Sequence, residues 1–170
     1  MIEIDDYSDV RERSVALGCV LGDGLVFLPD NLEEVAAADE LVVRGEVTTL
    51  RKVLMQGGLQ SGVLANPGGR PPGFVHNKSH DWAVPMIFVS AELMKNSPDM
   101  IGVAMDLIRD YAVSLLKGIG TDRTVKAEIV VERSSAGTFQ KITYEGAVEV
   151  LSEITEMVAR VHGQDASGIC

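Results

Sequence analysis

Residues 125–144 read VKAEIVVERSSAGTFQKITY, and this stretch decides the fold class. The runs 125–133 and 138–144 alternate apolar and polar side chains, as strands with one buried face do. Ser-Ser-Ala-Gly between them has the length of an ordinary hairpin loop. We therefore predict two antiparallel strands that turn one face to a core. Their apolar positions are Val125, Ala127, Ile129, Val131, Phe139, Ile142 and Tyr144.

An amphipathic helix is predicted over residues 147–161, directly after this hairpin. Its apolar residues recur at intervals of three and four, which places them on one narrow stripe. Glu149, Glu153, Glu156 and Arg160 lie on the other side. A charged stripe opposite a clean apolar stripe is normally solvated, so we assign no site to it.

Before the hairpin, VPMIFVS at 84–90 predicts a central strand, because the run is apolar on both faces. Ser97-Pro98-Asp99 then combines a cap hydroxyl, a first-turn proline and a carboxylate, which predicts a helix over 97–117. From residue 84 the order is β-α-β-β-α. We predict an α+β fold of the ferredoxin-like, split βαβ type that lacks its last strand, arranged as a two-layer sandwich.

The helix 97–117 is apolar over more than half of its circumference. An ordinary surface helix has an apolar stripe of somewhat over ~100°, so this helix needs cover on two sides. We expect a second copy or another protein to provide it, and most simply a homo-oligomer. If helices at 31–38 and 49–56 cover the arc instead, the chain can stay monomeric. The interface candidates are Met100, Ala104, Leu107, Ile108, Tyr111 and Leu115.

The region before residue 59 is predicted as a polar segment followed by a hairpin and short helices. Residues 1–14 are polar and expected to be mobile or to depend on a partner for order. Residues 15–29 carry two apolar runs around Gly22-Asp23-Gly24, which predicts a β-hairpin. One of its strands could supply the missing edge of the main sheet. Residues 15–162 form one domain, and 163–170 form a frayed tail.

Three shorter elements follow this hairpin in the sequence. Asp30 and Glu33 have the spacing of a capping box, which predicts a helix through residue 38. Residues 41–44 fit either the end of that helix or a short strand. The run TLRKVLMQ predicts a helix that Gly57-Gly58 ends.

Residues 59–81 are rich in glycine and proline, so no regular element is expected to run through them. Loops this long in a compact domain are usually functional or disordered. His76, His80 and Asp81 supply metal-ligating side chains, although the preceding prolines and glycines disfavour the helix that would align the two rings. Solvent-facing loop residues are the alternative interpretation. Arg70 could contact an anion, but the segment lacks the ending of a phosphate loop.

Composition excludes several classes of function. The chain has 170 residues, 46% of them apolar, and a formal net charge of −10. Nucleic-acid binding draws on Lys and Arg, and so does attachment to anionic lipid, so we expect neither partner. The first residues do not resemble a signal peptide, and the two cysteines, Cys19 and Cys170, have no metal or redox spacing. We expect a cytoplasmic protein without a cofactor, in which Cys19 is a core residue.

The run KITYEGAVEVL at 141–151, after a charged hairpin, resembles small α+β accessory components of bacterial conflict systems. The resemblance covers about the last quarter of the chain and carries no catalytic motif. It implies an accessory role in a multi-protein defence system. Because no spaced catalytic set is present, we favour a non-enzymatic, self-associating interaction module. The alternative is a small metal-dependent enzyme or ligand-binding protein that uses His76, His80 and Asp81.

Overall fold

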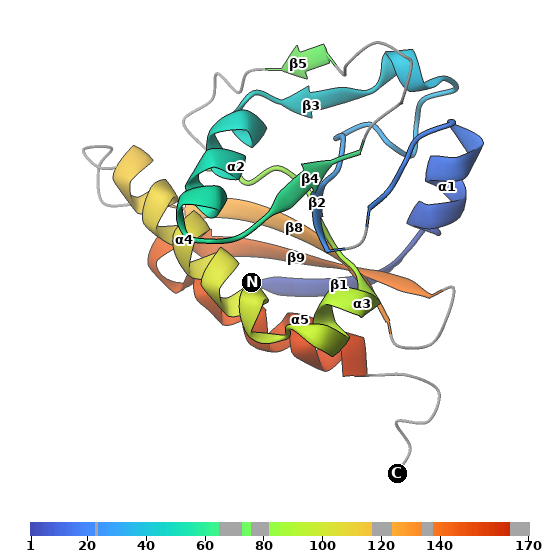
Figure 1. The fold of residues 1–170 in the computed structure, drawn as a ribbon. Coiled ribbons are helices and arrows are strands. Elements are labelled where there is room, and N and C mark those ends of the chain that lie inside the picture. Colours follow the sequence, from blue (N-terminus) through green and yellow to red (C-terminus); the bar gives the residue numbers. More distant parts are fainter. Residues whose placement is uncertain (23, 65–72, 76–81, 117–123, 134–137, 164–170) are drawn as a thin grey trace.

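The computed structural model describes residues 1–22, 24–64, 73–75, 82–116, 124–133 and 138–163 (Figure 1). The strands are β1 (Ile2–Tyr7), β2 (Leu25–Phe27), β3 (Val42–Arg44), β4 (Ser61–Val63), β5 (Gly73–Val75), β6 (Trp82–Ala83), β7 (Ile87–Val89), β8 (Thr124–Glu132) and β9 (Phe139–Ala147). The helices are α1 (Val10–Ala16), α2 (Glu46–Gln56), α3 (Ala91–Asn96), α4 (Asp99–Leu115) and α5 (Ile154–Gly163), with 3₁₀ turns η1 (Ala38–Glu40) and η2 (Val148–Glu153).

One mixed sheet organises the fold, with six strands in the order β1-β9-β8-β7-β2-β4. β9 is antiparallel to both β1 and β8, and β7 is antiparallel to β2. The pairs β7–β8 and β2–β4 are parallel. The short strand β6 also pairs with β8, and β3 and β5 form a separate parallel pair. The α+β class and the β8–β9 hairpin are therefore confirmed.

The split βαβ arrangement is wrong. In that arrangement an antiparallel strand separates the two parallel strands that a helix connects, whereas here β7 and β8 pair directly. The outer edge of β9 is taken by β1, which pairs with it over six residues. A hairpin pattern alone allows either of its strands to lie beside β7, so the sequence did not decide between the two orders.

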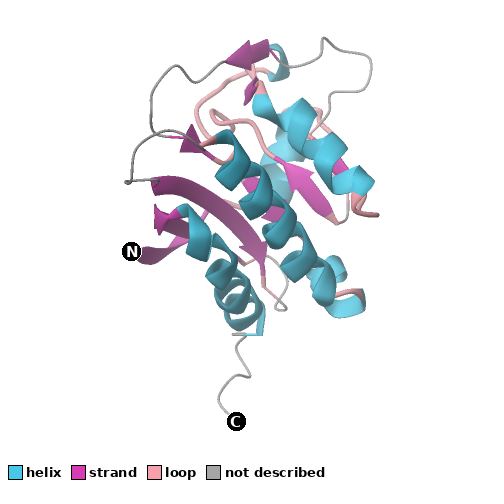
Figure 2. Cartoon of the chain, turned by 90° about the vertical axis from the view of Figure 1, so that its left-hand side faces the viewer, coloured by secondary structure: helices cyan, strands magenta, loops and turns pink. Residues whose placement is uncertain are grey.

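The two-layer prediction is also wrong, because both faces of the sheet carry a buried core. Ile87 and Phe27 face α2, α4, η2 and α5, while their neighbours Phe88 and Val26 face the other way. The second face is covered by α1 and by residues 28–41. Figures 1 and 2 show α4 and α5 lying against the first face. The continuous apolar run at 84–90 is explained by this position, with β7 central and buried on both faces.

The N-terminal segment is a structured part of the sheet, contrary to expectation. Residues 2–7 form β1, and Asp9 then begins α1 by accepting a hydrogen bond from the main-chain N–H of Glu12 at 3.0 Å. Because α1 includes Val15 and Ala16, the predicted hairpin over 15–29 does not form. Its second strand does form as β2 and joins the main sheet beside β7. Cys19 is buried, as predicted.

The helix predicted from Asp30 does not form, and both members of its capping box have other partners. Asp30 pairs with Arg44 at 2.9 Å, and Glu33 accepts a hydrogen bond from Ser8 at 2.5 Å. The strand alternative for 41–44 is confirmed as β3. The helix that ends at Gly57 is confirmed as α2, which begins at Glu46.

Two other segments differ in part from expectation. Short strands β4 and β5 form within residues 59–81, and the remaining positions 65–72 and 76–81 lie outside the described residues. The closing helix begins as the 3₁₀ segment η2, where Val150 has non-helical angles, and continues as α5. In the described part of the chain, no helix has both the length and the apolar character needed to cross a bilayer.

Candidate interaction groove

Helix α2 is amphipathic, and its two faces have different roles. Val47, Leu50 and Leu54 are buried in the core. The opposite face presents Thr48, Arg51, Lys52 and Met55, whose spacing of three, four and seven aligns them along one side. After α2, Gly58 adopts a left-handed φ of 87°, which turns the chain back so that residues 59–63 run beside the helix.

Strand β4 lies at one end of the sheet and has an open outer edge in the described structure. The main-chain N–H of Leu64 donates to the carbonyl of Phe27 in β2 at 3.2 Å. Because successive residues of a strand direct their N–H and C=O groups to alternate sides, those of Ser61 and Val63 face outward. These outward groups border the exposed face of α2.

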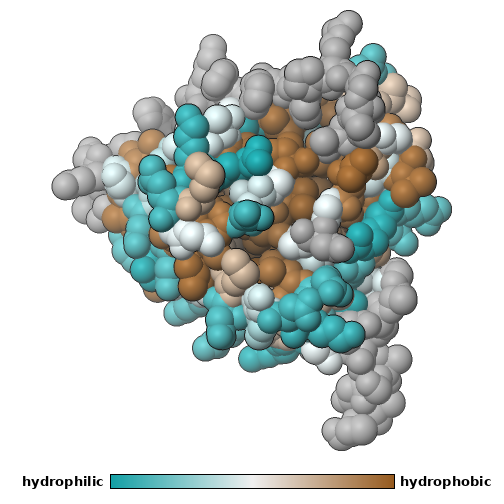
Figure 3. Space-filling view, in the orientation of Figure 1, coloured by the Kyte–Doolittle hydropathy of each residue, from teal (hydrophilic) through white to brown (hydrophobic). Residues whose placement is uncertain are grey.

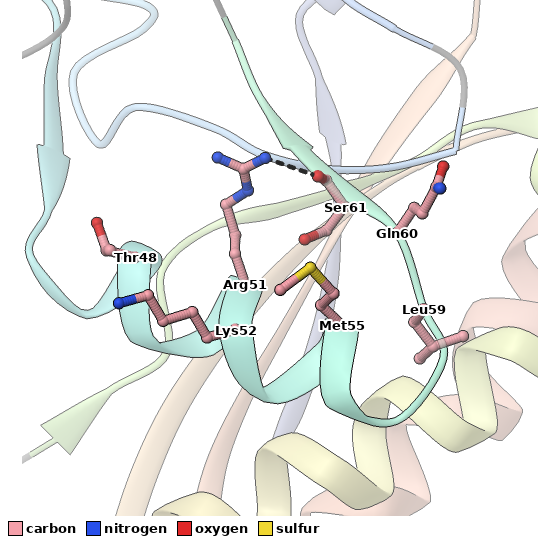
Figure 4. A pocket seen from close by; sticks show the side chains of 7 residues that line it. All are labelled: Thr48, Arg51, Lys52, Met55, Leu59, Gln60 and Ser61. Carbon is pink, nitrogen blue, oxygen red and sulfur yellow. Dashed lines mark hydrogen bonds between the residues drawn. The ribbon is translucent and has the colours of Figure 1, made fainter.

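The space between α2 and β4 is a groove of about 390 Å³ (Figure 4), which we call the α2–β4 groove. Its lining residues come from the helix and from the strand that returns beside it: Thr48, Arg51, Lys52, Met55, Leu59, Gln60 and Ser61. Two of the lining side chains are apolar. Leu59 is buried and forms part of the floor of the groove, whereas Met55 is 66% exposed and forms part of its wall. The face in Figure 3 likewise shows apolar surface gathered among polar side chains near its centre.

A small apolar hollow continues from this groove and shares Leu59 and Gln60 with it. The rest of the hollow is lined by Leu25, Leu93, Met100, Ile101 and Ala104. The groove therefore runs from basic side chains on α2 to an apolar depression near the start of α4.

Positive charge distinguishes the groove from the protein as a whole. Arg51 and Lys52 line it, and no carboxylate among the described residues does, although the chain carries a net charge of −10. Arg51 donates from Nη2 to the carbonyl oxygen of Ser61 at 3.1 Å. The hydroxyl of Ser61 is buried and has no hydrogen-bond partner in the described structure, and it points into the groove toward Met55 (Figure 4). A carboxylate with apolar neighbours is the chemistry that fits these groups.

A second hollow, of about 250 Å³, lies on the other face of the sheet and is mostly polar. Lys141 and Lys126 both approach Glu128, at 3.2 and 3.8 Å. Asp30, which also lines this hollow, pairs with Arg44, and burial raises the pKa of Asp30 above its usual value. These charged side chains of the second hollow already form ion pairs within the chain. They are therefore less available to bind a ligand than the basic side chains of the α2–β4 groove.

A tyrosine hydroxyl lies at the margin of this second hollow. Burial, followed by the nearby charge of Glu33, raises the pKa of Tyr7, and its hydroxyl contacts Met86 Sδ at 3.7 Å. Tyr7 is therefore a neutral donor at physiological pH. The Glu33 carboxylate lies beside this hydroxyl and favours its protonated form, so we assign no reactive role to Tyr7.

The predicted metal and anion residues are not placed by the structure. His76, His80, Asp81 and Arg70 all lie outside the described residues. Among the residues that the structure does describe, no three His, Cys, Asp or Glu side chains come together as a metal site.

The predicted interface on α4 is largely occupied by the same chain. Ala104 and Ile108 are buried in the core, and Met100, Leu107 and Tyr111 pack against it. Helices α2 and α5 and the 3₁₀ segment η2 all contact α4. The alternative that a helix at 49–56 covers the arc is therefore confirmed by α2, and most of the cover comes from within the chain. Leu115, at 44% exposed, is the member of the set that stays open to solvent. Self-association itself stays a prediction.

Sequence reasoning did not identify the α2–β4 groove. The helical spacing of Arg51, Lys52 and Met55 can be read from TLRKVLMQ. A polar face on a short helix usually faces solvent without binding anything, so this spacing alone does not predict a site. The second wall depends on β4, three residues within a segment where glycine and proline argued against a strand.

Comparison with known proteins gives no relative: no protein family model, no curated protein and no solved structure matches the chain.

Proposed function

We propose that this chain is a non-enzymatic protein-interaction module that binds an extended segment of a partner protein in the α2–β4 groove. The observation that carries the proposal is the outward main chain of Ser61 and Val63 beside a groove with basic and apolar walls. An extended segment added to an open sheet edge gains affinity from main-chain hydrogen bonds, and side-chain hollows give it specificity.

The lining defines the chemistry of the segment. A carboxylate of the partner would meet Lys52 and Arg51, whose N–H donors other than the one given to Ser61 have no partner among the described residues. The next side chain on the same face would meet Met55 and Leu59, so an apolar residue fits there. The expected ligand is an extended segment that carries both acidic and apolar residues.

Two further parts of the proposal come from the sequence. The resemblance of residues 141–151 to accessory components of bacterial conflict systems is consistent with a module that serves other proteins. Self-association is the other part, and Leu115 on α4 is its most exposed candidate residue.

The proposal is tested with an array of synthetic extended peptides that differ in charge and in apolar content. The wild-type protein should retain peptides that combine glutamate or aspartate with aliphatic residues. The variant Arg51→Glu/Lys52→Glu reverses the charge of the groove wall without touching the core, because both side chains are exposed. Retention of the acidic peptides should fall at least about tenfold, since each lost charge-assisted hydrogen bond removes roughly 1.5–3 kcal/mol.

The matched control is Lys95→Glu/Arg160→Glu, which makes the same change in net charge on α3 and α5. Both residues are exposed and neither lines the groove. The control should retain the acidic peptides nearly as well as wild type. Equal loss in the two double variants would mean that net charge, and not the groove, governs binding, and would overturn the proposal.

A further inference from the structure

The opposite end of the sheet also has an open edge, and it is longer. β1 is the last strand at that end, and no described strand pairs with its outer side. Met1 and Glu145 exchange both main-chain hydrogen bonds, at 2.8 and 2.9 Å. Because hydrogen-bonded and non-hydrogen-bonded pairs alternate in an antiparallel ladder, the N–H and C=O groups of Ile2, Ile4 and Asp6 point away from β9. A six-residue strand thus presents three evenly spaced donor and acceptor pairs.

The side chains of β1 divide by face, with Ile2, Ile4 and Asp6 on one face and Glu3, Asp5 and Tyr7 on the other. Ile2 and Ile4 lie on the α5 side of the sheet, opposite Tyr144 and Ile142, and each is 37% exposed. Glu3 and Asp5 lie on the other face and are exposed. Ile2 and Ile4 thus keep more than a third of their apolar surface exposed at an open edge, where soluble proteins usually protect a strand against further pairing.

The negative charge of β1 restricts which kind of strand can pair with its open edge. In a twofold pairing of β1 with a second copy of itself, centred on Ile4, Glu3 of one strand would lie opposite Asp5 of the other. Like charges directly opposite each other destabilise a strand pair. A strand that alternates basic and apolar residues fits instead, with its apolar side chains beside Ile2 and Ile4 and its basic side chains beside Glu3 and Asp5.

We propose that the β1 edge is a second docking surface, which takes an extended basic–apolar strand of a partner protein. It does not rest on the α2–β4 groove, because the two edges lie at opposite ends of the sheet and present opposite charges. The chain would then hold two different extended segments and join the proteins that carry them.

The experiment uses two peptides, one alternating lysine and valine and the other alternating glutamate and valine, both with blocked ends. Each is titrated into the isotopically labelled full chain while the main-chain amide signals are followed by NMR. The lysine peptide should shift the amides of Ile2, Ile4 and Asp6, and added salt should weaken the effect. The glutamate peptide should leave these three amides unchanged.

Three variants separate strand addition from general electrostatic attraction. Ile4→Pro removes a donor that faces outward, so the pairing of β1 with β9 should persist while the lysine peptide no longer binds. Glu3→Lys/Asp5→Lys should weaken binding about tenfold or more, a loss of about 1.4 kcal/mol. Asp39→Lys/Glu40→Lys makes the same charge change at exposed positions in η1 and should bind as wild type does.

The proposal is overturned if the lysine peptide fails to shift Ile2, Ile4 and Asp6, or if the glutamate peptide shifts them equally. It is also overturned if Ile4→Pro, with its β9 signals intact, binds the lysine peptide as wild type does. If Ile4→Pro does not fold, the two charge variants decide the question. None of these outcomes depends on Arg51 or Lys52, so the proposal for the α2–β4 groove is tested independently.

Discussion

Arg51 Nη2 donates to the main-chain oxygen of Ser61 across 3.1 Å, so a helix side chain holds an acceptor on the open edge of β4. This contact occupies one acceptor of the edge, so the N–H of Ser61 and both main-chain groups of Val63 are the outward groups that a partner strand would meet. It also fixes the guanidinium at the groove wall, where its other N–H groups are available to a carboxylate. The same residue thus occupies part of the edge and defines the ligand.

The first prediction concerns the geometry of Arg51. Arg51→Ala should lower the affinity for an acidic–apolar peptide about tenfold or more, because a charge-assisted hydrogen bond contributes roughly 1.5–3 kcal/mol. The affinity of Arg51→Lys should lie between those of Arg51→Ala and wild type, since lysine keeps the charge but lacks the planar guanidinium group. Isothermal titration calorimetry measures both variants. Wild-type affinity in Arg51→Ala would remove this residue from the site.

The second prediction concerns pH. Glu132 accepts hydrogen bonds from Arg11 Nε at 2.6 Å, from Arg11 Nη2 at 3.0 Å and from the N–H of Ala91 at 2.9 Å. Burial raises the pKa of Glu132, but the Arg11 and Ala91 hydrogen bonds together outweigh it, so the pKa lies below its usual value. Stability from this group is therefore full above the unfolded pKa of about 4.3 and is lost as pH falls through the folded pKa.

Glu132→Gln is the variant that tests this sign. At pH 7 it should lower the free energy of unfolding by roughly 1–3 kcal/mol, because charge-assisted hydrogen bonds are weakened. The difference from wild type should shrink as the pH is lowered below 4, where the wild-type carboxyl becomes protonated as well. Urea unfolding at several pH values measures this. A difference that grows on acidification would contradict the predicted sign.

The third prediction separates core from surface along α4. Ile108 is fully buried, whereas Leu115 is 44% exposed. Ile108→Ala should cost roughly 2–5 kcal/mol of stability, because the cavity it leaves cannot close completely. Leu115→Ala should cost about 0.5 kcal/mol or less, as surface substitutions usually do. Similar losses in urea unfolding would mean that the helix is packed differently from the structure.

The fourth prediction concerns self-association. If it involves α4, it should use Val103 and Leu115, the exposed apolar residues of that helix, since its other apolar positions are partly or fully covered within the chain. Sedimentation equilibrium should then show a mass that rises above 18.2 kDa with concentration. Leu115→Glu should return the mass to that of the monomer without loss of fold. A wild-type mass that stays near 18.2 kDa would remove self-association from the proposed function.

Periodic segments were predictable from the sequence, and the order of their assembly was not. The alternation along β8 and β9, the run at β7 and the helix α4 each depend on local patterning, and the structure contains them. The predicted cap of α4 by the Ser97 hydroxyl is wrong, because the helix begins at Asp99 and no side chain in the described structure caps it. The position of β1 depends on its pairing with β9, which lies more than a hundred residues away in sequence. The polar composition of β1 itself does not indicate a strand. A long-range pairing leaves no local signal in a single sequence.

The groove shows the same limit at a smaller scale. Ser61 belongs to a three-residue strand whose register is fixed by its pairing with β2. The residues SGV alone therefore do not predict a strand at the edge of a sheet. The sequence predicts that the wide apolar arc of α4 needs cover, either from a partner or from helices at 31–38 and 49–56. The structure supplies that cover from α2, which packs so closely that a Cβ added at Gly57 would lie 2.5 Å from Leu107 Cδ1.

The central claim is that the open edge of β4 receives an extended segment, and the amide of Val63 tests it most directly. Val63→Pro removes this outward N–H while Gly62 and Leu64 keep their pairing with β2. With the acidic–apolar peptide bound, the wild-type Val63 amide should be protected from hydrogen exchange, and the folded Val63→Pro variant should no longer bind. Unchanged exchange at Val63 in the saturated complex, or wild-type affinity in Val63→Pro, would contradict the account.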